Sequence, residues 1–438
     1  MSVVTPFFGD EAAAREVATR LRALRLAPGD EVILADNTPS GTFGRAVPNP
    51  PFRVAVAAGE RSSYHARNVG AELARGDWLL FLDADCVPPP DLIDAYFAQP
   101  VEPRVGLMAG PIRPAPDQTG LLPDWAATRQ ILSQQAGTER DPPGAATANL
   151  MVRRSDWAAV GGFFEGIRSG EDHEFSWRVG DTGRLLEYRP GAAVDHINRD
   201  SLRGVVRQMT RYAAGNAWQN RRRPDAAPPP LGPKPVLRAV AAAPIFLLTL
   251  RPRRAALKVI DAIVALFQIG GGLLGNGVAP RLPPEGDEQR LVIATDRFPV
   301  PSETFVTEEL AALRDSGRAF RVEAIERPAC PAHGGARGAD ARYAEDEGTL
   351  DRLRSLVWVV ARHPLRALAD FVVRRRVGSG ERLPLRAVAP FARRLAAGGE
   401  RQVNVHSTEM ACVIALRAGR IAGVSVSLTG ARADVDEF

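Results

Sequence analysis

The chain has 438 residues, a formal net charge of +5 at pH 7, and a composition of 45% hydrophobic and 24% charged residues. These proportions are those of globular proteins; they exclude wholesale disorder and predict two or three domains of ~100–200 residues each. The basic residues, nearly all arginine, are spread along the chain rather than gathered in dense runs, which argues against a nucleic-acid partner. Three distant cysteines, Cys86, Cys330 and Cys412, form neither a disulfide framework nor a zinc motif, so we expect a reducing, cytoplasmic compartment.

Composition divides the chain into three zones. Residues 1–223 alternate strand-like and helix-like segments, residues 224–288 hold two apolar stretches between proline-rich linkers, and residues 289–438 begin a new alternation. The first and last zones therefore predict α/β domains, because strands that alternate with helices form mainly parallel sheets. A helical linker is expected between them.

The first zone opens with strand-like segments that end in polar or acidic residues. Residues 2–5 and 31–35 are typical of strands, and the second is followed by Asp36. Residues 78–82 form a continuous apolar run, as in strands buried on both faces of a parallel sheet, and Asp83-Ala84-Asp85 follow directly. Ligands of open α/β sheets bind at these carboxyl ends, where two close carboxylates favour a divalent cation. The alternative is that the acids only cap the strand before a proline-rich turn.

Helical segments are expected at residues 11–26 and 65–75 of the first zone. Further along, Glu171 and Asp172 stand where another helix would begin, and the helix dipole favours anions there. Simple capping of that helix is the alternative. His196 follows a short strand, and a lone histidine is more often a core or surface residue than a metal ligand.

The ordered set of motifs resembles the family 2 inverting glycosyltransferases with the GT-A fold. The residues that carry the resemblance are Thr5-Pro6, Asp36, Arg67-Asn68, Asp83-Ala84-Asp85, Ala148–Met151 with Gly161–Phe163, Glu171-Asp172, His196, and Gln208 with Arg211-Tyr212. It covers residues 1–223 and implies a mainly parallel sheet flanked by helices. Asn37 departs from the second aspartate of many members, and Tyr212 from the tryptophan, which makes a processive polymerase less expected.

The resemblance also implies a role for each residue. The resemblance implies that Asp36 contacts the nucleotide base. It assigns donor binding to Thr5, Pro6, Asp36, Arg67, Asp83, Ala84, Asp85, Gln208 and Arg211. Mg²⁺ or Mn²⁺ would be held by Asp85 and Asp83 with help from His196, and would neutralise the leaving diphosphate. Asp172 would be the general base, while Glu171 would position the acceptor or anchor the helix.

We therefore expect an inverting, metal-dependent glycosyltransferase that moves a sugar from a nucleotide-diphosphate donor to a polysaccharide, glycolipid or related acceptor. One alternative is a non-catalytic scaffold built from degenerate glycosyltransferase domains, against which the intact acids speak. Another is a Rossmann-type oxidoreductase, which needs a Gly-x-Gly-x-x-Gly turn after the first strand. The chain has Thr5–Asp10 there instead.

The middle zone holds apolar stretches at residues 236–250 and 255–275, separated by Arg251-Pro252-Arg253-Arg254. We expect each to be too short or too interrupted to span a bilayer, and the N-terminus lacks the pattern of a signal peptide. An interfacial helical hairpin at the inner face of the plasma membrane is predicted for residues 236–275. The alternative is a pair of helices packed on a neighbouring domain.

The last zone predicts strands at residues 291–295, 321–325, 403–406 and 423–428. It resembles the acceptor-side, Rossmann-like half of family 4 glycosyltransferases with the GT-B fold, on residues 297–305 and His406. Because the nucleotide-sugar site of that family lies mostly in its other half, we expect residues 289–438 not to transfer sugar alone. An acceptor-binding module, a remnant and half of a split enzyme remain open.

Overall fold

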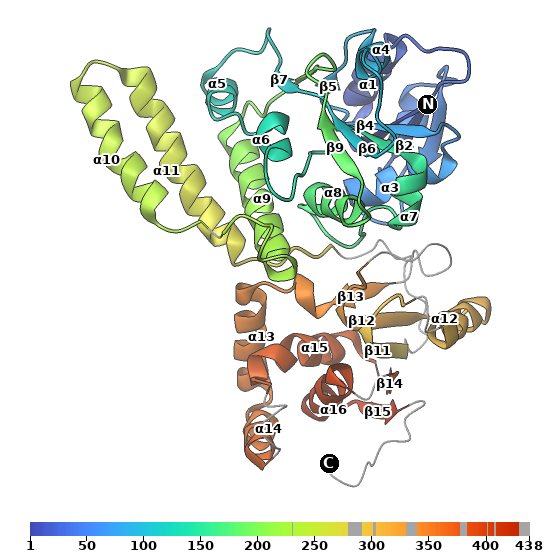
Figure 1. Ribbon diagram of the computed structural model, residues 1–438. Coiled ribbons are helices and arrows are strands. Elements are labelled where there is room, and N and C mark those ends of the chain that lie inside the picture. The colour runs from blue at the N-terminus through green and yellow to red at the C-terminus, as the bar shows by residue number, and fades with distance from the viewer. Residues whose placement is uncertain are drawn as a thin grey trace. The chain divides into compact units, whose positions relative to one another are not determined.

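The computed structural model describes residues 1–229, 231–278, 291–300, 304–329, 340–376, 383–400, 402–406 and 409–428. The chain divides into two compact units, Met1–Gly272 and Leu273–Phe438 (Figure 1). The linker expected at residues 280–290, residues 301–303 of the family 4 motif, and Cys330 lie outside the described residues. The expected domain boundaries at 223 and 288 stay predictions.

The first unit is built on a seven-stranded sheet. Its strands are β1 (Ser2–Phe7), β2 (Glu31–Asp36), β3 (Arg53–Val56), β4 (Trp78–Leu82), β6 (Val105–Ala109), β8 (Asn149–Arg153) and β9 (Leu185–Tyr188), in the order β3-β2-β1-β4-β8-β6-β9. Only β8 runs antiparallel to its neighbours β4 and β6. The other neighbouring pairs of this sheet are parallel, which confirms the predicted α/β class.

Helices cover both faces of this sheet. The helices between residues 1 and 223 are α1 (Glu11–Arg22), α2 (Thr42–Ala46), α3 (Ser63–Leu73), α4 (Leu92–Tyr96), α5 (Leu121–Thr128), α6 (Gln134–Thr138), α7 (Arg154–Ala159), α8 (Glu171–Asp181) and α9 (Leu202–Arg222). Successive residues of a strand point to opposite faces of the sheet and belong to different hydrophobic cores. Val3 belongs to the core formed with α1, α2 and α4. Val4 belongs to the core formed with α3, α7, α8 and Trp218 of α9. This alternation explains the continuous apolar runs of the strands, since both faces are buried.

A glycine sets the distance between α3 and the sheet. A Cβ atom on Gly70 would lie 2.5 Å from Cγ1 of Val4, so no larger residue fits without a shift. The close approach seats α3 against β1, and the segment expected as a helix at 65–75 forms at Ser63–Leu73. Arg67 is thereby carried to the carboxyl edge of the sheet.

A small second sheet contains β5 (Cys86–Val87), β10 (Val194–His196) and β7 (Ile112–Pro114) in the order β5-β10-β7. β10 pairs antiparallel with β5, and His196 stands opposite Cys86 in this register. Because Cys86 follows Asp85 in sequence, the pairing brings His196 to the end of the acidic triplet.

The middle zone forms a helical hairpin, α10 (Lys234–Leu248) and α11 (Pro252–Gly272), which belongs to the first unit. In Figure 1 the two helices stand side by side, and α11 is the one that packs against α9 and α5. By length and composition, α11 could cross a membrane: its best window has a mean hydropathy of 1.5. This differs from the expectation that each stretch is too short or too interrupted to span a bilayer, because the helix continues from Pro252 through Lys258 and Asp261, which pair at 2.9 Å.

The second unit contains a five-stranded parallel sheet. Its strands are β11 (Leu291–Arg297), β12 (Phe320–Glu326), β13 (Ala341–Tyr343), β14 (Gln402–Val405) and β15 (Ser425–Leu428), in the order β13-β12-β11-β14-β15. The helices are α12 (Thr304–Asp315), α13 (Thr349–Arg362), α14 (Pro364–Arg376), α15 (Leu385–Gly398) and α16 (Met410–Ala422), with a 3₁₀ turn at Ala344–Asp346. His406 follows β14 with a buried ring, its Nε2 atom 2.8 Å from Oε2 of Glu309. The assignment of this unit to the GT-B fold stays a prediction.

Candidate functional site

The acidic triplet lies at the carboxyl end of β4 and is held through its backbone. The Asp83 amide donates to the Ala148 carbonyl at 3.2 Å, and Arg20 of α1 donates to the Ala84 carbonyl at 2.8 Å. Ala84 itself packs against the core, so the two aspartates on either side of it project from a fixed turn. Both retain partial exposure, with 29% for the Asp83 side chain and 30% for that of Asp85.

Arg67 of α3 pairs with the first aspartate. Its Nη2 atom donates to Oδ1 of Asp83, and only 4% of the arginine side chain is exposed. The guanidinium also lies over the Tyr64 ring, 5.5 Å from the centroid. Burial alone would lower the pKa of Arg67, but the charges of Asp83 and Asp172 raise it, so the arginine stays cationic. A buried cation therefore pairs with one of the predicted site acids and acts on a second through its charge.

The second aspartate, Asp85, faces the end of β10. Its Oδ1 atom lies 3.5 Å from Nε2 of His196, and its Oδ2 atom accepts from Arg199 at 3.2 Å. The other histidine nitrogen, Nδ1, lies 3.2 Å from the side-chain oxygen of Asn198. Burial would raise the pKa of Asp85, but His196 and Arg199 hold it below its ordinary value.

The two acids at the start of α8 differ in their surroundings. Glu171 is fully buried; its Oε1 atom accepts from the Phe164 amide at 2.5 Å and from Arg178 at 2.6 Å. Burial raises the pKa of Glu171 well above its ordinary value, with a further contribution from Glu174, although Arg178 opposes it. Without exposed surface, Glu171 anchors the helix rather than touching an acceptor.

Asp172 remains open, with 22% of its side chain exposed. Its Oδ1 atom lies 3.8 Å from Nδ1 of His173. Burial alone would raise the pKa of Asp172, but His173 and the charge of Arg67 hold it below its ordinary value. The start of α8 also favours the anion. Asp172 is thus ionised at neutral pH and reachable, as a general base must be.

Helix α9 contributes Gln208, Arg211 and Tyr212 to the same region. Gln208 Nε2 donates to the Tyr212 hydroxyl at 3.0 Å, and the Arg211 guanidinium lies 5.6 Å from the Tyr212 ring centroid. Burial raises the pKa of Tyr212, and the charges of Asp172 and Asp85 raise it further. The tyrosine therefore lies within electrostatic reach of both acids.

The predicted base-binding residue has another task in this structure. Asp36 is fully buried; Oδ1 accepts from the Thr38 amide at 2.9 Å and hydroxyl at 2.6 Å, and Oδ2 accepts from the Phe43 amide at 2.8 Å. The carboxylate thus shapes the loop after β2 and is not open to a nucleotide. Thr5 and Pro6 lie beside it on β1, opposite Leu34 and Ala35.

The expected three-residue metal set is not assembled. In the part of the chain that the structure describes, no three His, Cys, Asp or Glu side chains are grouped to hold an ion. Asp85 approaches His196, whereas Asp83 pairs with Arg67. Mg²⁺ commonly takes one or two carboxylates and completes its shell with substrate phosphates and waters. Asp85 and His196 fit an ion shared with a diphosphate.

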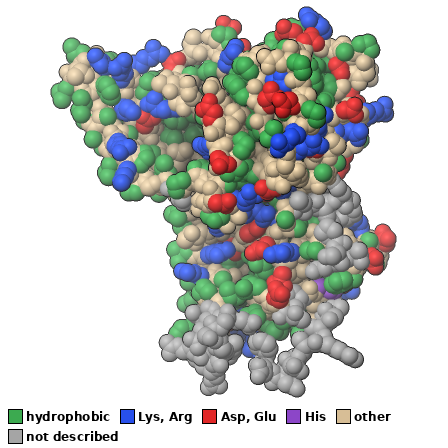
Figure 2. Space-filling view, viewed as in Figure 1, with side chains coloured by type: hydrophobic (Ala, Val, Ile, Leu, Met, Phe, Trp, Pro, Cys, Tyr) green, Lys and Arg blue, Asp and Glu red, His purple; other side chains and the backbone are tan. Residues whose placement is uncertain are grey.

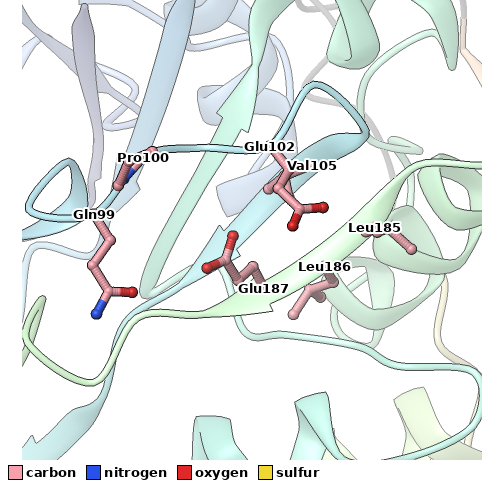
Figure 3. Close-up of a pocket in the computed structure, with 7 residues that line it drawn as sticks. All are labelled: Gln99, Pro100, Glu102, Val105, Leu185, Leu186 and Glu187. Carbon is pink, nitrogen blue, oxygen red and sulfur yellow. The ribbon is translucent and has the colours of Figure 1, made fainter.

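Among the described residues of the first unit, two cavities stand out. One of about 390 Å³ reaches from the segment 111–114 and the α5–α6 region to His196 and Asn198, so it adjoins the acids. The other, of about 530 Å³, is lined by Gln99, Pro100, Glu102, Val105, Leu185, Leu186 and Glu187 (Figure 3). It lies at the amino ends of β6 and β9, the opposite end of the strands from the acidic triplet.

Several residues that contact the site were given no role by the sequence. Arg199 pairs with Asp85, and Tyr64 accepts a hydrogen bond from the Glu171 amide at 3.3 Å. Asn68, predicted without a role, donates to the Phe163 carbonyl at 2.8 Å and accepts from its amide at 2.9 Å. It thereby clamps the glycine loop before α8. Their proximity to motif residues in sequence was the only available signal.

The chain matches two family models. Residues 2–153 match the model described as Glycosyl transferase family 2, and residues 78–278 match Glycosyl transferase family group 2. Both matched ranges overlap the zone of residues 1–223 whose motifs resemble family 2. Neither model extends beyond residue 278, so the resemblance of the last zone to family 4 stays a prediction.

Curated relatives are glycosyltransferases. The chain is 27% identical over 241 residues to the pre-mycofactocin glycosyltransferase of Mycobacterium tuberculosis, covering 52% of this chain and 49% of that protein. It is 27% identical over 166 residues to glycosyltransferase AglE of Haloferax volcanii, covering 36% and 53%. The chain therefore spans about half the length of the curated relatives that it matches.

The sequence identity to solved structures is lower than the identity to the curated relatives. The mannosyltransferase PcManGT from Pyrobaculum calidifontis, solved with GDP-Man and Mn²⁺, has a TM-score of 0.43 and 17% identity, covering 60% of this chain and 85% of that one. Glucosyl-3-phosphoglycerate synthase from Mycobacterium tuberculosis has a TM-score of 0.33 and 16% identity, covering 45% and 72%.

Proposed function

We propose that the first unit is an inverting, metal-dependent glycosyltransferase that moves a sugar from a nucleoside-diphosphate donor to a hydroxyl group of a glycan or lipid-linked acceptor. The observation that carries the proposal is the gathering of Asp83, Asp85 and Asp172 around Arg67 and His196. It lies where strands of an α/β sheet bind ligands. The family 2 domain matched by residues 2–153 supports the same reaction class.

The donor diphosphate is proposed to lie against the acidic triplet. Asp85 and His196 would hold Mg²⁺ or Mn²⁺, which when bound would neutralise charge on the leaving diphosphate. Arg199 already contacts Asp85, and half of its side chain is exposed, so it can also reach a phosphate oxygen. Asp83 retains its pairing with Arg67 and presents its free oxygen to the ribose.

Asp172 is proposed to remove the proton of the acceptor hydroxyl. The hydroxyl oxygen then bonds to the anomeric carbon as the bond from that carbon to the diphosphate oxygen breaks, which inverts the configuration. The lowered pKa of Asp172 keeps the carboxylate ionised before reaction. Glu171 holds Asp172 at the start of α8 through its contacts with Phe164 and Arg178.

The acceptor is proposed to enter the cavity of about 390 Å³ that ends at His196 and Asn198. Its volume is within the range of small-ligand sites. Its lining combines the Tyr188 ring and the exposed Arg113 with amide side chains of the α5–α6 region, a surface suited to hydroxyl-rich acceptors.

A donor screen tests the proposal. Purified protein is incubated with UDP-, GDP- or dTDP-sugars and Mg²⁺ or Mn²⁺, and release of nucleoside diphosphate is followed. We expect release from one donor, its loss in EDTA, and its loss in Asp172→Asn. Asp94→Asn, an exposed aspartate on α4, is the matched control. Absence of both release and calorimetric binding for every donor would favour the non-catalytic scaffold instead.

A further inference from the structure

Helix α10 is apolar and almost entirely uncovered. Ala239 is its one buried residue, whereas large apolar side chains elsewhere on it are exposed, up to 85% at Leu248. Leu250, in the turn that follows, is 89% exposed. A contiguous exposed apolar surface of this kind marks an interaction site in a soluble protein.

Helix α11 continues this surface on one side only. Ile260 and Val264 face inward and pack with Trp125 of α5 and Met209 of α9. Val259, Leu266 and Phe267 face outward and are exposed. We call the exposed apolar residues of both helices and their turn the hairpin surface; its members are Leu237, Val240, Ile245, Leu247, Leu248, Leu250, Val259, Leu266 and Phe267.

The charges around the hairpin surface are nearly all positive. Lys234, Arg238, Arg251 and Arg254 are exposed, and none forms an ion pair with any residue that the structure describes. The segment 234–272 holds a single acidic residue, Asp261. Figure 2 shows basic side chains interleaved with apolar ones over the hairpin. Long basic side chains beside apolar ones suit a lipid surface with anionic headgroups.

The one acidic residue of the hairpin ties it to the catalytic unit. Asp261 Oδ1 accepts from Trp125 Nε1 at 2.9 Å and from Arg129 Nε at 2.8 Å, and Oδ2 accepts from Arg129 Nη2 at 2.7 Å. Together with the packing of Ile260 and Val264, these bonds hold α11 against the protein. Helix α10 is ~22 Å long at ~1.5 Å per residue, short of a ~30 Å hydrocarbon core. Insertion across a bilayer is therefore disfavoured for both helices.

We propose that the hairpin surface docks on the headgroup region of an anionic lipid bilayer, with α10 and the turn at 249–251 entering the interface. Apolar side chains would bury among the acyl chains, while Arg238, Arg251 and Arg254 stay with the phosphates. Helix α5 carries Ala126 and Ala127, which line the cavity next to His196, so docking holds that cavity near lipid. Only this last step rests on the proposed function.

Vesicle sedimentation tests the docking. The full chain is mixed with sucrose-loaded vesicles of phosphatidylcholine alone, or of phosphatidylcholine with phosphatidylglycerol, and the bound fraction is measured. We expect binding to the mixed vesicles that weakens with added salt, since exposed charges are screened. The double variant Leu248→Asp/Leu250→Asp should bind these vesicles at least about tenfold more weakly than the wild type. The variant Arg251→Glu/Arg254→Glu should lose the preference for anionic vesicles.

Leu26→Asp provides the matched control, because Leu26 is an exposed leucine in the loop between α1 and β2. Thermal unfolding shows that each variant is folded. Unchanged vesicle binding by the leucine variant, or no binding of the wild type, would overturn the proposal. So would dimerisation that is lost in the leucine variant without vesicle binding, since the hairpin would then cover a second copy. The assay reads binding alone, so an inactive transferase leaves it interpretable.

Discussion

Arg67 and Asp83 form an ion pair between α3 and the end of β4, although 16 residues separate them in sequence. The arginine is almost fully buried and the aspartate is partly exposed, so the pair orients one acid toward solvent. Because the charge of Arg67 also lowers the pKa of Asp172, one cation influences both the donor side and the base. The relation depends on the close packing of α3 on β1 at Gly70.

Replacing this cation should impair turnover more than folding. We expect Arg67→Gln to lower nucleoside-diphosphate release by about 10–100-fold, the equivalent of one charge-assisted hydrogen bond of ~1.5–3 kcal/mol. Initial rates with the donor identified in the screen measure the effect. Arg15→Gln, which removes an exposed arginine of α1, should leave the rate unchanged. Equal rates for Arg67→Gln and wild type would refute the role.

The two neighbouring acids of α8 should separate in their effects. Asp172→Asn removes the base, so we expect a ~10²–10⁴-fold lower rate with donor affinity retained. Because the pKa of Asp172 lies below its ordinary value, the wild-type rate should show no loss from its protonation between pH 7 and pH 5. Initial rates across this pH range and calorimetric donor binding check both statements.

Glu171→Gln should instead cost stability. It removes one of the two carboxyl partners of the buried Arg178, leaving Glu174, and breaking such buried pairs costs about 3 kcal/mol. Chemical denaturation of Glu171→Gln and Asp172→Asn side by side measures the difference. If Glu171→Gln were as stable as the wild type but inactive, Glu171 would take part in the reaction rather than only stabilise the helix.

The pair Asp85 and His196 should govern metal affinity. We expect His196→Ala to weaken Mn²⁺ binding about tenfold, since loss of a ligand or its partner has effects of at least this size. Electron paramagnetic resonance of Mn²⁺, alone and with the nucleoside diphosphate of the active donor, gives the affinity. His363→Ala, a change in the second unit, serves as control. Unaltered Mn²⁺ affinity would remove His196 from the proposed metal site.

Asp261 should make the stability of the first unit depend on pH. Burial would raise its pKa, but Arg129, Lys258 and Trp125 lower it below the ordinary value. A carboxylate with a lowered folded pKa stabilises above its unfolded pKa of ~4, and this contribution disappears as the pH falls through the folded value. We expect Asp261→Asn to be ~1–2 kcal/mol less stable at neutral pH.

Thermal unfolding of wild type and Asp261→Asn at several pH values checks this prediction. The difference between them should begin to shrink near pH 4 and disappear as the pH falls through the lowered pKa of the folded wild-type carboxylate. A difference that is constant with pH would mean that the loss comes from packing rather than from charge. Asp181→Asn, which alters an exposed pair with Arg223, should show little effect.

Local sequence determined the elements of the fold and the resemblance of the first zone to a known family. Trp78–Leu82 forms the strand that its apolar run predicts, because both faces of that strand are buried. The ordered motifs of the first zone pointed to family 2, and residues 2–153 match the model of that family. Such features depend on neighbouring residues and on their order, so a single sequence reveals them.

The tertiary structure decided which of these residues meet. Pairing of β5 with β10 sets His196 beside Asp85, and the seating of α3 on β1 turns Asp83 toward Arg67. Asp36 has the predicted position but uses both carboxylate oxygens to hold its own loop. The sequence does not distinguish the roles of the neighbouring acids Glu171 and Asp172. In the structure Glu171 is fully buried, whereas Asp172 is partly exposed. Contacts between distant segments and the loss of water around a charge arise only when the chain packs, and these set partners and pKa values.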